Sequence, residues 1–198
     1  LEELHRRHLF TDRSAGVEVS YQYHALFRAF LRRRAEQRFS RDEFSKLLVF
    51  SAGLLRAHGQ SEDAVEIYRE GGAWAEAEEL MLALAPALLA AGRWRTLQAW
   101  LVSLPGEQLS RSAWALYWLG NSHVQNASTS AREWLIKAND AFVRNGDVSG
   151  RLLSAAAILR SIHFEYRTFE PMDQWIAQID ADLAATPAFS NPADELAV

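Results

Sequence analysis

The chain has 198 residues and a formal net charge of −4, with 21 Lys and Arg against 25 Asp and Glu. It has no cysteine, which excludes disulfides and thiolate metal sites, and its longest apolar run, LMLALAPALLAA, is too short to span a bilayer. These features favour a cytoplasmic protein with no membrane partner and a core of its own. Because the first residue is leucine and no signal sequence follows, we expect a piece of a longer protein.

The charges are unevenly distributed along the chain. Residues 1–58 hold 11 basic and 7 acidic side chains, whereas residues 59–198 hold 10 basic and 18 acidic ones. A basic segment followed by an acidic one indicates two modules with different partners.

The N-terminal segment contains the only β pattern in the sequence. Residues 1–8 are typical of the end of a helix, and residues 17–23 alternate apolar and polar side chains with the period of two of a half-buried strand. We expect this strand to form a hairpin with residues 9–11. A helical pattern then begins at His24, and the order helix, hairpin, helix predicts that residues 1–40 are the C-terminal part of a winged-helix module.

The helix predicted after His24 is amphipathic. Leu26, Phe27, Phe30 and Leu31 are expected on one face, with a run of arginines on the other: Arg28, Arg32, Arg33 and Arg34. These arginines are candidates for facing the phosphates of DNA. The alternative is a solvated helix face, which we favour because no aromatic or amide side chains accompany the run as readers of base edges.

Residues 41–198 are predicted to be entirely helical. Ser40 and Glu43 have the spacing of a capping box, which places the module boundary near residues 38–42. The expected helices span residues 41–57, 61–70, 74–91, 93–103, 111–126, 128–145, 148–167 and 171–185. Pro86 should bend or split the third of them, because it removes a backbone donor.

Glycines mark the stops between the first of these helices. Gly59, Gly72 and Gly92 each follow a helical run and fit the left-handed C-cap conformation. Short helices joined by short turns pack antiparallel, so residues 41–198 are predicted to form an array of helical hairpins. The expected fold class is mainly α: an antiparallel helical-hairpin, tetratricopeptide-like superhelix preceded by a partial winged-helix module with one β-hairpin.

One pair of helices resembles a degenerate tetratricopeptide repeat. An aromatic residue, a Leu-Gly pair, an alanine and a phenylalanine occur in the order of that repeat, between Trp114 and Phe142. Trp114, Tyr117 and Trp118, with His123 beside them, are candidates for lining a concave surface that binds an effector or a protein. The alternative is ordinary packing, which we expect for Trp74, Trp94, Trp100, Trp134 and Trp175.

No catalytic set is visible. The sequence has no phosphate-binding loop, no HExxH and no serine, histidine and acid at a recognisable spacing, and its six histidines share no metal-ligand spacing. We therefore expect neither an enzyme nor a metal site in these residues.

Two strings carry a family resemblance: SYQYHALFRAFLRRR and AVEIYREGGAWAEAEELMLALAPALLAAGRWRTLQAWLVSLP. Both resemble the LuxR-type, ATP-dependent transcriptional regulators of the STAND class that are related to the activator of the maltose regulon. In that family a nucleotide-binding module ends in a winged helix, a helical-repeat sensor follows, and a C-terminal helix-turn-helix binds DNA. The resemblance implies that residues 1–40 end the ATPase module and that residues 41–198 begin the sensor.

The resemblance also implies partners. ATP or ADP, an inducer or regulatory protein, and self-association belong to the full-length protein, and DNA binding belongs to a C-terminal domain outside these residues. His24 is similar in position to the winged-helix histidine that contacts the diphosphate of ADP in related ATPases, although Tyr23 and Ala25 depart from that motif. The alternatives are a histidine that caps its helix or packs under the hairpin. For the chain as a whole, the alternative is a free-standing tetratricopeptide-like adaptor that binds a protein or peptide.

Overall fold

The computed structural model describes residues 3, 6–7, 10–15, 19–124, 128–165 and 169–185. The chain divides into two compact units, residues 1–73 and 74–198, hereafter unit 1 and unit 2. The described residues are mainly helical, and no helix among them is long and apolar enough to cross a bilayer. The expected module boundary near residues 38–42 lies inside unit 1, and as a boundary between family modules it stays a prediction.

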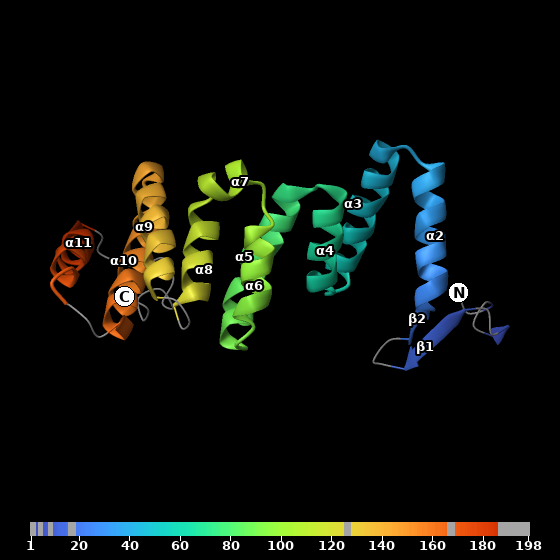
Figure 1. Ribbon diagram of the computed structural model, residues 1–198, viewed down its shortest axis with the longest axis horizontal. Helices are drawn as coiled ribbons and strands as arrows, with labels where there is room; N and C mark the ends of the chain where they lie inside the picture. Colours follow the sequence, from blue (N-terminus) through green and yellow to red (C-terminus); the bar gives the residue numbers. More distant parts are fainter. Residues whose placement is uncertain are drawn as a thin grey trace. The chain divides into compact units, whose positions relative to one another are not determined.

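Unit 1 begins with two short strands and a long helix (Figure 1). Strand β1, Thr11–Ala15, pairs antiparallel with β2, Val19–Tyr23, so that Thr11 lies opposite Tyr23. The first strand begins at Thr11, the last of the expected residues 9–11, and extends to Ala15. Strand β2 has five residues, so five residues of β1 lie opposite it. The pairing continues one step further, because the amide of His24 donates to the carbonyl of Phe10 at 2.7 Å.

Among the described side chains, helix α2, Ala25–Arg38, contacts the hairpin through the ring of Phe27. Phe27 stacks on Phe10 with ring centroids 5.2 Å apart and meets Tyr23 edge to face at 5.3 Å. No residue of α2 is buried, and Leu26 and Phe30 of the expected apolar face are 78% and 59% exposed. The apolar residues Leu26 and Phe30 are therefore exposed in the part of unit 1 that the structure describes.

The rest of unit 1 is a helical hairpin of α3, Arg41–Ala57, and α4, Ser61–Gly71. The predicted capping box is confirmed: the amide of Glu43 donates to Ser40 Oγ at 3.3 Å, and the amide of Ser40 donates to the Glu43 carboxylate at 2.8 Å. An ion pair between Arg32 and Glu70 joins α2 to α4. The end of the predicted winged helix and the first helical hairpin thus share one compact unit.

Unit 2 continues with seven described helices (Figure 1). They are α5 Trp74–Ala90, α6 Trp94–Val102, α7 Gly106–Arg111, α8 Ala113–His123, α9 Ser128–Asn145, α10 Val148–Glu165 and α11 Met172–Ala185. Six of them match expected helices, with end shifts of at most three residues. Helix α7 was not expected, and α5 continues through Pro86 as one helix, which excludes the predicted split, whereas the predicted bend stays a prediction. Burial of Ala85 and Leu88 on either side of the proline holds the helix together.

The predicted left-handed glycine caps are confirmed. Gly59, Gly72 and Gly92 have φ values of 75°, 72° and 71°, a region in which a residue with a Cβ is strained. At Gly72 and Gly92 the following residue, Ala73 or Arg93, donates its amide to a carbonyl five residues back, as in a Schellman cap. The stops depend on local chain geometry, which explains why the sequence predicts them well.

The main core of unit 2 lies between α8, α9 and α10. Its buried side chains include Leu116, Tyr117, Leu135, Phe142, Ile158 and Ile162. Gly120 and Gly150 permit the close approach of these helices, because a Cβ at Gly120 would lie 2.6 Å from the Leu135 side chain and one at Gly150 would lie 2.3 Å from the Phe142 ring. This series of helices fits a helical-repeat arrangement.

Candidate functional site

His24 occupies the N-cap position of α2, between the strand and the arginine-bearing helix. Its carbonyl accepts a hydrogen bond from the amide of Arg28 at 2.9 Å, but its side chain makes no capping hydrogen bond and is exposed. The imidazole therefore neither caps the helix nor packs under the hairpin. The exposure that we expected is present, and the proposed contact with a diphosphate stays a prediction.

The four arginines of α2 are exposed, but they do not form one ridge. At 100° per residue, Arg28 and Arg32 share a side of the helix, whereas Arg34 points between Leu26 and Phe27. The expectation that all four lie opposite the apolar residues is therefore wrong. Arg32 pairs with Glu36 at 3.5 Å and with Glu70, which is typical of a solvated, salt-bridged face more than of a phosphate-binding surface.

The aromatic candidates on α8 belong mainly to the core. Tyr117 is 6% exposed, while Trp114 and Trp118 are half-buried and pack against the same cluster. Phe142 of α9 lies edge to face with Trp114, at a centroid distance of 4.9 Å. Packing thus explains Tyr117, contrary to the expectation of a surface lined by all three rings. A binding role for the exposed edges of Trp114 and Trp118 stays a prediction.

His123, at the end of α8, is half-buried. Its Nε2 lies 3.0 Å from the side-chain nitrogen of Gln98, which fits an amide donor and a neutral imidazole acceptor. Burial lowers the pKa of His123 below its ordinary value. The residue is therefore held in its neutral form by its surroundings and serves first as a contact between α6 and α8.

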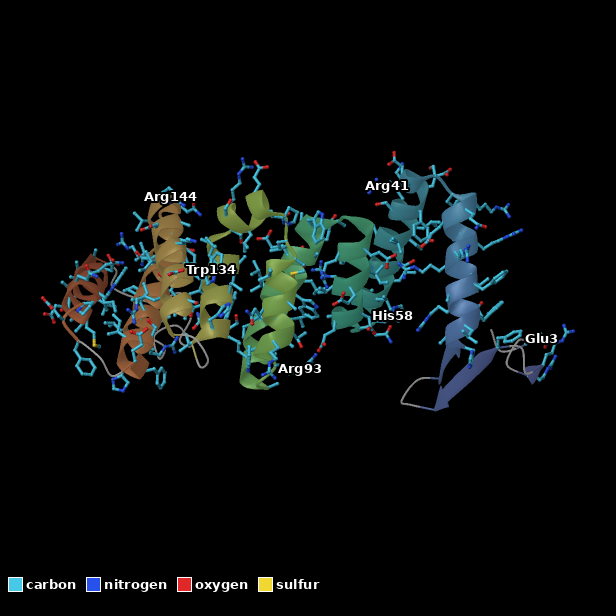
Figure 2. The ribbon with its side chains drawn as sticks, viewed as in Figure 1. Glu3, Arg41, His58, Arg93, Trp134 and Arg144 are labelled. Carbon is cyan, nitrogen blue, oxygen red and sulfur yellow. The ribbon has the colours of Figure 1, made fainter. Side chains whose placement is uncertain are left out.

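A pocket of about 450 Å³ lies between α7, α8 and α9, and we call it the α9 pocket. It is lined by Gly106, Leu109, Ser110, Leu116, Trp134, Lys137, Asp140 and Arg144. Figure 2 shows Trp134 and Arg144 on the same helix, with Arg144 near its C-terminal end. The ammonium of Lys137 lies over the Trp134 ring, 4.4 Å from its centroid.

The sequence did not point to the α9 pocket. Trp134 was assigned to packing, and the charged residues that follow it were not singled out. The available signal was their spacing, since positions 134, 137, 140 and 144 recur along one side of a helix. The opposite wall is α7, a helix of six residues that the sequence did not predict.

A smaller pocket, of about 300 Å³, lies where α5 and α6 meet α8 and α10. Trp94, Val124 and Phe164 supply its apolar lining, and Arg160 donates a hydrogen bond to the Asn121 side chain at 3.2 Å. Within the described ranges, no three His, Asp or Glu side chains lie close enough together to hold a metal ion. Both pockets lie within unit 2, which also contains a more open pocket of about 510 Å³ beside α7.

The family comparison matches the N-terminal segment alone. The family model described as the MalT winged helix domain matches residues 1–43, which include the hairpin, His24 and α2. No curated protein and no solved structure matches the chain. The first 43 residues are therefore similar to the winged helix of MalT-like transcriptional regulators.

Proposed function

We propose that the chain is a non-catalytic part of an ATP-dependent, LuxR-type transcriptional regulator of the STAND class. In this proposal residues 1–40 end the ATPase module, and residues 41–198 begin a tetratricopeptide-like sensor that couples an inducer or regulatory protein to the ATPase switch. The observation that carries the proposal is the match of residues 1–43 to the MalT winged helix, followed directly by helical hairpins. A free-standing adaptor would leave this match unexplained.

The packing of unit 1 supports the coupling. The hairpin, α2 and the α3–α4 pair lie in one compact unit, so the predicted boundary between ATPase and sensor does not separate two independent bodies. The capping box of Ser40 and Glu43 fixes the start of α3, and the Arg32–Glu70 ion pair bridges α2 and α4. In this proposal a movement of the winged helix reaches the first helices of the sensor mainly through the chain connection at Ser40, since the exposed ion pair contributes little.

The nucleotide belongs to the longer protein in this proposal. His24 suits a diphosphate because its imidazole is exposed and makes no capping bond, and because it lies at a helix start where amide groups point outward. When bound, ADP would supply the negative charge that His24 contacts. DNA binding is assigned to a C-terminal domain, and the longer protein would act in the cytoplasm.

The test uses that longer protein with His24→Ala and, as a matched control, His58→Ala. His58 is an exposed histidine of unit 1 at the C-cap of α3, on a different element from His24. We expect His24→Ala to weaken ADP binding and raise basal transcription with unchanged thermal unfolding, while His58→Ala changes neither. Equal ADP affinity in the two variants would remove the role of His24. A longer protein that binds no ATP would favour the adaptor.

A further inference from the structure

The α9 pocket is a concave site that the winged-helix resemblance does not explain. Its volume of about 450 Å³ lies in the range of small-molecule sites, roughly 300 to 1,000 Å³. The lining comes from three helices of unit 2, so the site is complete within one compact unit. A ligand of modest size would fit without further protein.

One side of the pocket is apolar. Leu109 of α7, Leu116 of α8 and Trp134 of α9 line it, and Trp134 is half-buried. The Lys137 ammonium lies over the indole, 4.4 Å from the ring centroid. Such a wall favours an aliphatic or aromatic group, because contact with it removes apolar surface from water.

The charged part of the lining comes from α9 and is mostly cationic. Lys137, Asp140 and Arg144 are exposed and follow one another along the face of α9 that carries Trp134. Asp140 and Arg144 form no ion pair with any residue that the structure describes. The guanidinium of Arg144 is thus an available planar donor, and its paired N–H groups match the geometry of a carboxylate.

We propose that the α9 pocket binds a small apolar carboxylate. The apolar part lies against Leu109, Leu116 and Trp134, and Arg144 holds the carboxylate. Lys137 adds positive potential, and Asp140 disfavours a second negative charge on the ligand. The role of such a ligand as the sensed effector rests on the proposed function, whereas its binding does not.

The experiment titrates the 198-residue chain with 4-phenylbutyrate and, separately, with the neutral 4-phenylbutyramide, followed by amide NMR shifts. We expect saturable binding of the acid and at least about tenfold weaker binding of the amide, since a charged hydrogen bond is lost. Arg144→Gln should weaken acid binding about tenfold and Lys137→Gln about fivefold. Asp140→Asn should bind the acid as tightly as the unchanged chain or more tightly.

The matched control is Arg95→Gln. This substitution removes one positive charge. It also removes a cation–π contact like that of Lys137, because the Arg95 guanidinium lies 4.6 Å from the Trp94 ring centroid. Arg95 does not line the α9 pocket. Acid affinity should not change in this variant.

Four results would each overturn the proposal. They are equal affinities for acid and amide, unchanged acid binding in Arg144→Gln, an equal loss in Arg95→Gln, and no saturable binding. The titration involves neither nucleotide nor DNA, so its failure would leave the regulator proposal standing. Conversely, a longer protein that binds no ATP would not contradict the proposed binding of a carboxylate in the α9 pocket.

Discussion

Two helical regions of this molecule share an amphipathic sequence pattern and differ in burial. Helix α2 in unit 1 has no buried residue, and its Phe30 is 59% exposed. In unit 2, Phe142 of α9 is 1% exposed and lies against Trp114, Tyr117 and Gly150. An apolar stripe therefore predicts a helix, but its burial depends on whether another element of the same unit covers it.

The difference lies in the neighbours of each helix. Helices α8, α9 and α10 follow one another through short connections and approach closely at Gly120 and Gly150, so each covers the next. Helix α2 meets the hairpin at one end, and its tie to α4 is an ion pair of Arg32, whose side chain is 49% exposed. Such a pair contributes little, about 0 to 1 kcal/mol.

The largest expected effect is the difference in stability between alanine substitutions at Phe142 and at Phe30. Phe142→Ala should lower the free energy of unfolding of unit 2 by about 3 to 5 kcal/mol, because it leaves a cavity between three helices. Phe30→Ala, the matched control, should change stability by less than about 0.5 kcal/mol. Urea unfolding followed by tryptophan fluorescence reports on unit 2, since all seven tryptophans lie in residues 74–198. Far-UV circular dichroism covers both units. Equal effects of the two substitutions would contradict the comparison.

The next effect tests the close approach of α9 and α10. Gly150→Ala should destabilise unit 2 by about 1 to 3 kcal/mol, because the new methyl group would meet the Phe142 ring. Gly106→Ala is the control, since no atom lies within 4 Å of the position that its Cβ would take. Both variants are compared by urea unfolding. If Gly150→Ala is as stable as Gly106→Ala, the helices are packed less tightly than described.

Local rules explain which features the sequence predicts. The left-handed glycines and the capping box depend on a few consecutive residues, and the structure confirms them. The burial of Tyr117 depends on α9, which covers it, so its aromatic character alone gave the wrong expectation of an open surface. Pro86 was expected to bend or split its helix, and it does not split it, because tertiary packing of its neighbours outweighs the lost donor.

The α9 pocket shows why a site is harder to predict than a fold. Its charged residues are visible as a helical stripe, but the stripe becomes a pocket only because α7 lies opposite. Helix α7 has six residues, directly after Pro105, and this segment reads as a loop. A pattern-based prediction therefore includes the charged face of α9 but not the wall that completes the pocket.

A smaller effect concerns the start of α3 in unit 1. Ser40→Ala removes the acceptor for the amide of Glu43 and should destabilise α3 by about 1 kcal/mol. Ser51→Ala, in the middle of the same helix, should cost less than about 0.5 kcal/mol, because the Ser51 hydroxyl only bonds back to the Leu47 carbonyl. Amide hydrogen exchange over residues 41–46 measures the difference. Equal protection in both variants would show that the capping box contributes nothing.

The smallest expected effect is a dependence of unit 2 on pH through His123. Burial lowers the pKa of this imidazole in the folded chain, so the unfolded chain takes up the proton more readily. The contribution of the neutral His123 imidazole to the stability of unit 2 is therefore present above pH 6.5, the ordinary pKa of histidine. It is lost as the pH falls below that value. His123→Gln should remove this part of the pH dependence of stability between neutral pH and about pH 5.5.

The control is Gln98→Ala. It should keep the pH dependence and lower the stability of unit 2 at every pH, because it removes the hydrogen bond to His123 but not the titrating group. Unfolding followed by tryptophan fluorescence confines the measurement to unit 2, so the lowered pKa of Glu43 in unit 1 does not contribute. An unchanged pH dependence in His123→Gln would mean that another group of unit 2 responds to acid.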